Sequence, residues 1–504
     1  MLRRSGAMTP FLYSTLSGIL LFFCFPKANL SFLAWIALIP LIASVKGAKP
    51  GKSFLFGFIS GVVFFCGYLY WLVPTFTAAG EPWITGVVVL LLLSSYLALY
   101  LAVFCALSTR FSNPLFLASL WVVLEYIKGH LFSGIPAGIL GYSQWNFLPV
   151  IQVCDITGVY GVSFLIVFVN VAVFRYILSR FSKPLIRGGA RGLIYASLIF
   201  AAFLFYGAYR LSGPGEKGES PGFKVAVLQG NIDQYKKWDR NYADEIMNVY
   251  DRLAKESTFR DRPDLIVWPE SSIPGFLLEE KQLYRRIKGL ANLTQAYHLI
   301  GSADTRDGKY FNSAVLLSPD GSVASRYDKI HLVPFGEAVP LKSFLGKFIK
   351  AVNELGGFTA GEKYTVFSLP FNNRPVRFSS NICFESIFPE LVRKFRYQEF
   401  IINITNDAWY LKTSAPYEHF TFNVFRAVEN RKQVVRCANT GISGHIDSRG
   451  RIISRTEIFT AGAPAYLVNP NTSVTFYSRF GDLFVFFCLI VILYFVLQPA
   501  RFKR

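Results

Sequence analysis

The sequence has few charged residues for its length. Asp, Glu, Lys and Arg make up only 17% of its 504 residues, whereas 52% are hydrophobic and the mean hydropathy is +0.36. Typical soluble domains carry about 25% charged residues, so this composition excludes an ordinary soluble enzyme. Internal repeats and low-complexity tracts are also absent, which excludes a solenoid.

Cysteine and histidine are scarce as well, with seven and five copies. No spacing among them resembles a zinc site, and we expect neither a metal nor another cofactor. Five cysteines fall in or beside apolar runs, where a small apolar residue is the ordinary interpretation. Only Cys383 and Cys437 lie elsewhere, in two different strand-like segments, and we do not expect a disulfide between them.

Long apolar runs account for the missing charge. Runs of roughly 20 residues are candidates for transmembrane helices. Seven lie before residue 212 and an eighth runs from about 482 to 498. The seven are residues 11–25, 30–45, 54–73, 84–108, 114–132, 153–174 and 192–211. The first run lacks the small-residue cleavage site of a signal peptide, so the sequence predicts a membrane domain of about eight transmembrane helices.

Basic residues outnumber acidic ones by 52 to 32, and their distribution is uneven. They gather in alternate loops such as residues 46–52 and 175–191, while the loops at 74–83 and 131–152 contain no Lys or Arg. A nucleic-acid partner would favour one basic face on a soluble domain. The alternation instead matches the positive-inside rule, which predicts both termini in the cytoplasm and residues 212–481 on the far side.

The polar insert has a different pattern. A Gly/Pro-rich linker at 212–223 is followed by short apolar, β-rich runs that alternate with helical spacing at 239–258 and 281–296. This alternation indicates an α/β layered domain. We therefore predict three parts: an N-terminal transmembrane bundle at 1–211, the α/β domain at 212–481, and a C-terminal transmembrane helix with a basic tail at 482–504.

Three chemically useful residues follow separate predicted strands in this insert. Glu270 ends the run from Asp264, Lys329 follows a second run, and Cys383 closes a third. Each residue alone is more often structural. Strand ends of α/β proteins, however, converge on the crevice where ligands bind. A cysteine nucleophile, a carboxylate base and a cation that stabilises an oxyanion form a set for acyl transfer through a thioester.

Other polar residues share these short segments. Glu337 lies eight residues after Lys329, and Phe384 and Glu385 directly follow Cys383; we predict that all three support the site. His331 and His419 are alternative bases, to which we assign structural roles. The insert is flanked by apolar runs, so the acyl chemistry is expected at a membrane surface.

The motifs around these residues resemble those of the nitrilase superfamily, and the membrane context narrows the resemblance to the apolipoprotein N-acyltransferases. The matching segments include Trp268-Pro269-Glu270, the stretch from Lys329 to Glu337, and Cys383-Phe384-Glu385. Further matches lie at residues 141–144, 227–232, 403–409, 426–429 and 439–443. The sequence departs from the family pattern at Ala137 and Leu411, which leaves the triad intact.

The resemblance implies an α-β-β-α sandwich for the insert and a multi-pass protein of the bacterial inner membrane, with this domain on the periplasmic face. It implies transfer of an acyl chain from a phospholipid to the α-amino group of a diacylglyceryl-cysteine on an apolipoprotein. Glu270 would be the base, Lys329 the oxyanion stabiliser and Cys383 the nucleophile. Trp238 is a candidate for substrate binding, and we expect a monomer.

Three other classes of function share some of these features. A membrane-anchored nitrilase-type amidase would use the same triad on a small C–N bond, but it would not need seven leading spans. A non-enzymatic scaffold would not need a complete triad. A transporter would carry several charges inside its spans, and Glu125 is the main candidate there.

Overall fold

The computed structural model describes residues 8–181, 189–213, 222–234, 236–237, 239–334, 336–337 and 357–498. The chain divides into two compact units. The first comprises Met1–Gly213, Thr413–Thr421 and Thr475–Arg504, and the second comprises Pro214–Lys412 and Phe422–Val474.

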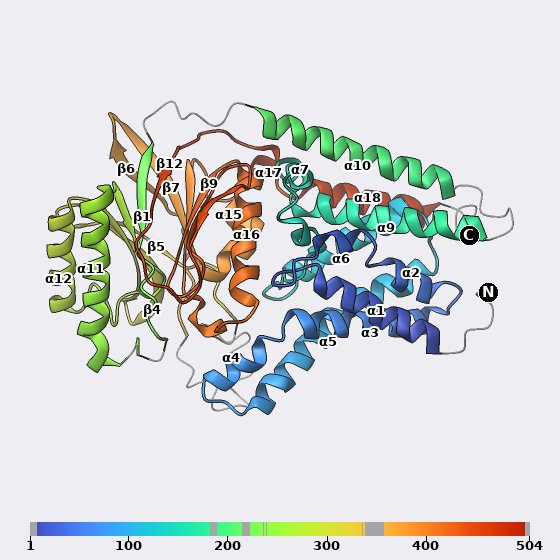
Figure 1. Cartoon of the computed structure of the whole chain (residues 1–504), viewed down its shortest axis with the longest axis horizontal. Coiled ribbons are helices and arrows are strands. Elements are labelled where there is room, and N and C mark those ends of the chain that lie inside the picture. The colour runs from blue at the N-terminus through green and yellow to red at the C-terminus, as the bar shows by residue number, and fades with distance from the viewer. Residues whose placement is uncertain are drawn as a thin grey trace. The chain divides into compact units, whose positions relative to one another are not determined.

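The first unit is helical (Figure 1). Its longer helices are α1 (Met8–Phe23), α3 (Pro50–Tyr68), α5 (Trp83–Ser108), α6 (Pro114–His130), α9 (Val159–Phe181), α10 (Gly189–Ser212) and α18 (Leu483–Leu497). Shorter helices are α2 (Ile39–Val45), α4 (Leu72–Ala78), α7 (Leu148–Ile151), α8 (Cys154–Thr157) and α17 (Phe476–Phe480). Glycines let two of these helices approach closely: a Cβ on Gly57 or Gly61 of α3 would lie 2.5 or 2.6 Å from the backbone of α5, a packing common between membrane helices.

Four helices among the described residues are long and apolar enough to cross a membrane. They are Pro50–Tyr68, Trp83–Ser108, Val159–Arg180 and Ala190–Ser212. The protein thus has a helical region with four candidate spans, and the predicted number of eight is not confirmed. The predicted run at 30–45 is interrupted, because a 3₁₀ turn at Ser31–Trp35 precedes α2, which begins anew with Pro40 in its first turn.

The second unit contains two six-stranded sheets. The first has the order β12-β1-β2-β3-β4-β5 and the second the order β11-β10-β9-β8-β7-β6. The strands of the first are β1 (Phe223–Val227), β2 (Leu265–Val267), β3 (Tyr297–Arg306), β4 (Lys309–Leu317), β5 (Val323–Asp328) and β12 (Ala465–Val468). Those of the second are β6 (Val366–Phe371), β7 (Arg374–Ile382), β8 (Phe400–Thr405), β9 (Gln433–Ala438), β10 (Gly444–Ile446) and β11 (Ile452–Arg455).

Helices cover the outer faces of the two sheets (Figure 1). The long helices α11 (Ala243–Asp261) and α12 (Lys281–Thr294) cover the first sheet, while α15 (Pro389–Val392) and α16 (Ala415–Asn430) lie on the side of the second. Buried side chains of α11 such as Met247 and Tyr250 pack with Ile266 and Trp268 from β2 and its end. The predicted α/β sandwich is therefore confirmed, with its layers in the order α-β-β-α.

Strand direction brings the three predicted residues to one edge. Strands β1, β2 and β3 run parallel; β4 is antiparallel to β3, and β5 is antiparallel to β4, so β2 and β5 point the same way. In the second sheet β7, β8 and β9 are parallel. Glu270, Lys329 and Cys383 each follow the carboxyl end of one of these strands.

Candidate active site

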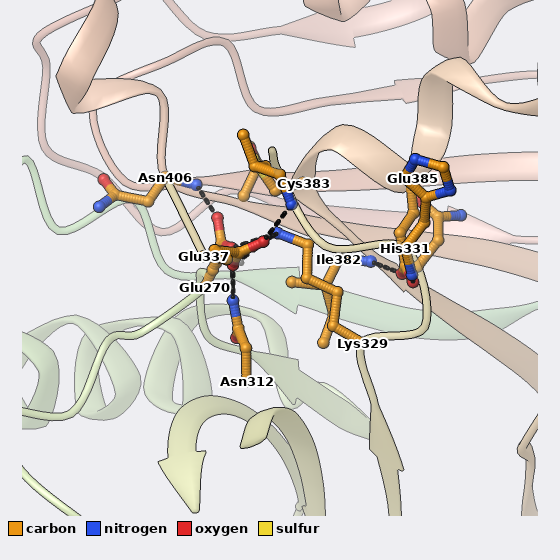
Figure 2. A network of polar contacts seen from close by, with 12 residues as sticks. Glu270, Asn312, Lys329, His331, Glu337, Ile382, Cys383, Glu385 and Asn406 are labelled. Atoms are coloured by element: carbon orange, nitrogen blue, oxygen red, sulfur yellow. Dashed lines mark hydrogen bonds and ion pairs between the residues drawn. The ribbon is translucent and has the colours of Figure 1, made fainter. Parts of the chain in front are cut away.

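Glu270 is buried three residues beyond the end of β2, and both of its carboxylate oxygens accept hydrogen bonds (Figure 2). Asn312 Nδ2 donates to Oε1 at 2.9 Å, and Lys329 Nζ lies 3.2 Å from the same oxygen. The backbone N–H of Asn406 donates to Oε2 at 2.9 Å. The Glu270 side chain is therefore held by residues from both sheets. A catalytic base needs such a fixed position to stay aligned with its nucleophile.

Lys329 lies between two carboxylates (Figure 2). Its Nζ is 2.8 Å from Glu337 Oε2 as well as 3.2 Å from Glu270, and Asn312 also donates to Glu337, at 2.8 Å. Burial by itself lowers the pKa of Lys329, but the two carboxylates outweigh burial and raise this pKa well above its usual value. Lys329 in turn holds the pKa of Glu337 below its usual value, against the effect of burial. The lysine is therefore a fixed cation.

Cys383 is buried where β7 gives way to a 3₁₀ turn, Cys383–Ile387. Its φ of +53° places a residue with a side chain in the left-handed region, a strain of about 1–3 kcal/mol that is common at active sites. Burial, and then the negative charge of Glu270, raise the pKa of the Cys383 thiol, which Lys329 only partly offsets. The resting sulfur is a neutral thiol that needs a base to become a nucleophile.

Glu385 joins the cysteine turn to the lysine loop. Its Oε2 accepts the backbone N–H of Ile382 at 2.7 Å, and its Oε1 accepts Tyr327 Oη at 2.8 Å and the N–H groups of Ile330 and His331 at 2.7 and 3.1 Å. Figure 2 shows Glu385 beside His331, apart from the cluster of Glu270, Glu337 and Lys329. Burial raises the pKa of Glu385 to about 7, even though these donors favour the anion. Glu385 positions the two loops and does not face the carboxylate pair.

Several residues that complete this network were not predicted from the sequence. Asn406 follows β8 and is held by Gln234 and by Asn439 Nδ2, the latter at 3.1 Å. Asp407 accepts Arg436 Nη2 at 2.7 Å in a pair with no exposed surface. Asn406 and Asp407 had the same signal as the triad, a polar pair at a strand end, whereas Asn312 lies inside β4 and had none.

Lys237 is a further buried cation near the base. Its Nζ donates to the backbone oxygen of Glu270 at 3.1 Å, and burial lowers the pKa of Lys237 to about 8 despite the opposing effect of Glu270. This contact fixes the backbone at Glu270. Trp238, the predicted substrate-binding residue, lies outside the described residues.

The remaining predicted residues flank the cluster. Phe384 is half-buried and its ring meets Phe388 edge-on at 5.1 Å, while the ring of His331 contacts Phe388 at a tilt of 31°, with the ring centroids 3.8 Å apart. Cys437 is fully buried in β9 and its Sγ donates to the backbone oxygen of Val267 at 3.3 Å. His331 and Cys437 thus have packing roles in this unit.

Comparison with known families accounts for both parts of the chain. The family model described as "Apolipoprotein N-acyltransferase N-terminal domain" matches residues 17–172. The model described as "Carbon-nitrogen hydrolase" matches residues 224–466, in agreement with the predicted nitrilase-like fold of the second unit.

Relatives that match this chain over most of its length include two apolipoprotein N-acyltransferases. The apolipoprotein N-acyltransferase of Geobacter metallireducens is 42% identical over 95% of this chain and 93% of its own length. That of Haemophilus influenzae is 31% identical over 94% of this chain and 91% of its own length. An amidase from Nesterenkonia sp. is among the similar solved structures, with a TM-score of 0.40 and 17% identity over 55% of this chain and 99% of its own. The chain belongs to the apolipoprotein N-acyltransferase family, and the predicted family and enzyme class, an acyltransferase of the membrane, are confirmed.

Proposed function

We propose that the protein transfers an acyl chain from a phospholipid, through a thioester on Cys383, to the α-amino group of a diacylglyceryl-cysteine at the N-terminus of an apolipoprotein. The observation that carries this proposal is the position of Cys383 at a strained strand end, under the influence of both the Glu270 carboxylate and the Lys329 cation. The names of the full-length relatives support the substrate class.

In the first half-reaction Glu270 takes the proton of the Cys383 thiol as sulfur attacks the ester carbonyl of the phospholipid. The carbonyl oxygen becomes an oxyanion, which the Lys329 ammonium and the backbone N–H of Phe384 stabilise. The ester C–O bond then breaks. The lysophospholipid oxygen leaves with the proton held by Glu270, and the acyl chain stays on sulfur as a thioester.

In the second half-reaction the lipoprotein amine attacks the thioester carbonyl. The C–N bond forms as Glu270 takes a proton from the amine, and the same donors stabilise the second oxyanion. The oxyanion then collapses, the C–S bond breaks, and the acyl chain remains on nitrogen as an amide. The proton returns from Glu270 to the sulfur, which restores the neutral thiol. The reaction is therefore ping-pong, with one carboxylate serving as base and acid in turn.

The supporting residues have distinct tasks in this scheme. Glu337 shares Lys329 with Glu270, and Asn312 bonds to both carboxylates, so the cation is kept in place between them. Glu385 sets the distance between the Lys329 loop and the Cys383 turn. We assign Trp238, together with the positions at Ala137 and Leu411, to docking of the substrates.

We further propose that the protein lies in the bacterial inner membrane as a monomer, with eight spans, both termini in the cytoplasm and residues 212–481 outside it. The described basic residues support this topology, because Lys46, Lys49, Lys52 and Arg110 lie where α2 and α5 end and α3 and α6 begin. Helices such as α18, with 15 residues, extend about 22 Å, which is short of a hydrocarbon core of about 30 Å. Local thinning of the bilayer would accommodate them.

The test of this function is a two-substrate assay on the purified protein. With phospholipid and a diacylated lipopeptide, the account predicts a triacylated lipopeptide and one lysophospholipid per turnover. A protein that hydrolyses small amides and leaves the lipopeptide unchanged would instead be the membrane-anchored amidase.

A further inference from the structure

The first unit contains a cavity of ≈ 540 Å³ that the acyl-transfer scheme does not use. It is lined by the end of α2 and the residues after it, the end of α5, the segment leading into α6, and the last turns of α9. All of its lining residues belong to the first unit. Glu270, Lys329 and Cys383 belong to the second.

The cavity has an apolar part and a cationic part. Leu41, Phe104 and Val171 line it and are almost completely buried. Lys46 and Arg175 also line it, and both are accessible to solvent, Lys46 the more so. A site that combines buried apolar walls with solvent-accessible cations matches a ligand with a hydrocarbon tail and an anionic head.

Arg175 is positioned for such a head. Its Nη1 donates to the backbone oxygen of Ser112 at 2.5 Å and to Ser112 Oγ at 3.0 Å. These bonds fix the guanidinium at the cavity and leave its other nitrogens for a ligand. Ser108 and Thr109 also line the cavity. Their hydroxyl groups donate to the backbone oxygens of Cys105 and Ala106, each at 2.8 Å, and their oxygens can still accept from the hydroxyl group of a glycerol.

The charged residues that line the cavity are of one sign, Lys46 and Arg175. No carboxylate lines the cavity. The carboxylates in the described part of the first unit are Glu81, Glu125, Asp155, Glu418 and Asp482, and none of them is among the lining residues. Lys49 and Lys52 lie at the same end as the cavity, at the start of α3. A zwitterionic head, with an ammonium of its own, would meet these cations less favourably than a purely anionic one.

We propose that this cavity is a binding site for one anionic phospholipid. The phosphodiester lies between Lys46 and Arg175, and an acyl chain runs along Leu41, Phe104 and Val171. Basic pockets between membrane helices are a known way to bind such headgroups, and a volume of this size falls within the range of about 300–1,000 Å³ of small-molecule sites. With the topology proposed above, the site opens to the cytoplasmic leaflet, opposite the catalytic domain. The binding itself does not depend on the acyl-transfer proposal.

The experiment is native mass spectrometry of the full-length protein in detergent, with phosphatidylglycerol added at graded concentrations. The expected result is one tightly retained lipid, at least tenfold more strongly held than phosphatidylethanolamine with the same chains. Equal retention of the two lipids would overturn the charge argument. Displacement by glycerol phosphate, which has no chains, at the same concentration as the lipid would overturn the assignment to a lipid.

Two variants and a matched control locate the site. The double variant Lys46→Gln/Arg175→Gln should lose the retained lipid by at least tenfold. Lys49→Gln/Lys52→Gln removes the same charge at the same end of the helices without lining the cavity, and it should retain the lipid; an equal loss in this control would overturn the site in favour of diffuse attraction.

Because Arg175 also bonds to Ser112, a second variant keeps both cations. Ala48→Trp places a large ring among the lining residues and should displace the lipid while the thermal unfolding midpoint without added lipid stays near that of the parent. Full retention of phosphatidylglycerol by Ala48→Trp would contradict the proposal.

Discussion

At the scale of single residues, Glu270 is held by donors on both of its oxygens, and this arrangement decides what its replacement should do. Glu270→Gln keeps the shape of the side chain but cannot take the thiol proton, so the rate of thioester formation should fall by about 10²–10⁴-fold. Lys329→Met should give a similar loss, because it removes the cation that stabilises the oxyanion. Single-turnover detection of the thioester with phospholipid alone measures this step.

The control for this pair is Glu279→Gln, a change at an exposed carboxylate on the loop that follows Glu270. It should form the thioester at the parent rate. If Glu270→Gln also forms it at that rate, Glu270 is not the base, and Glu337, the other carboxylate that contacts Lys329, becomes the better candidate.

Glu385 gives a prediction about pH. Burial raises the pKa of this carboxyl from 4.5 to about 7, and only the anion can accept from all of its donors at once. Activity should therefore fall as the pH drops through 7, approaching tenfold per pH unit. Between pH 7 and 4.5 the folded state binds more protons here than the unfolded state, so this group makes the free energy of unfolding rise on acidification. Activity and the stability contribution of Glu385 thus change in opposite directions.

The variant Glu385→Gln separates this effect from other ionisations. The amide NH₂ group of the glutamine faces at least one backbone N–H donor and leaves it without an acceptor, at a cost of about 1–3 kcal/mol. The Lys329 loop and the Cys383 turn then lose their alignment, and thioester formation should slow by about 10- to 100-fold. The acidic limb near pH 7 should disappear from its pH profile. A limb that survives unchanged in Glu385→Gln, with Glu362→Gln as the exposed control, would show that another group titrates there.

At the scale of elements, strand β3 packs through Gly301 against the backbone of Pro269 and Glu270. A Cβ added at Gly301 would lie 2.2 Å from the backbone oxygen of Pro269 and 2.6 Å from the Cα of Glu270. Gly301→Ala should therefore move the segment after β2 away from the sheet and slow thioester formation by about tenfold or more, with a loss of stability of about 1–3 kcal/mol. Gly289→Ala on the open face of α12 has nothing within 4 Å. It should leave the rate unchanged and stabilise its helix slightly.

Parent-like activity in Gly301→Ala would show that the close approach of β3 does not set the position of Glu270. Thermal unfolding of both variants, measured beside the single-turnover assay, distinguishes a displaced side chain from a domain that no longer folds.

Elements also show how far the sequence could predict this site. Glu270, Lys329 and Cys383 follow strands β2, β5 and β7. They were predicted because an apolar run that stops at a polar residue is visible in the local sequence. Asn312 and Lys237 were not assigned roles, because their contacts with Glu270 depend on sheet pairing and on a loop far away in sequence. Strand β12 was missed for the same reason: it pairs with β1 across more than 230 residues, and neither segment alone contains that information.

At the scale of the whole molecule, the charge pattern predicts which side of the membrane each unit faces. Phe259 in α11 is 93% exposed, and Phe259→Cys provides a reporter in the second unit. A membrane-impermeant maleimide should label it in intact spheroplasts. Lys49→Cys, at the start of α3, should be labelled only after lysis. Labelling of Phe259→Cys only after the membrane is broken would refute the proposed topology.

The central claim is that the acyl chain passes through a covalent bond to one cysteine, and mass spectrometry of the intact protein tests it most directly. After mixing with phospholipid and no acceptor, the protein should gain the mass of one acyl chain, located on Cys383 by peptide mapping and removed by a diacylated lipopeptide. Cys383→Ala should show no adduct, and Cys437→Ala, a control at a buried cysteine of β9, should show the full adduct. An adduct of equal size in Cys383→Ala would contradict the account.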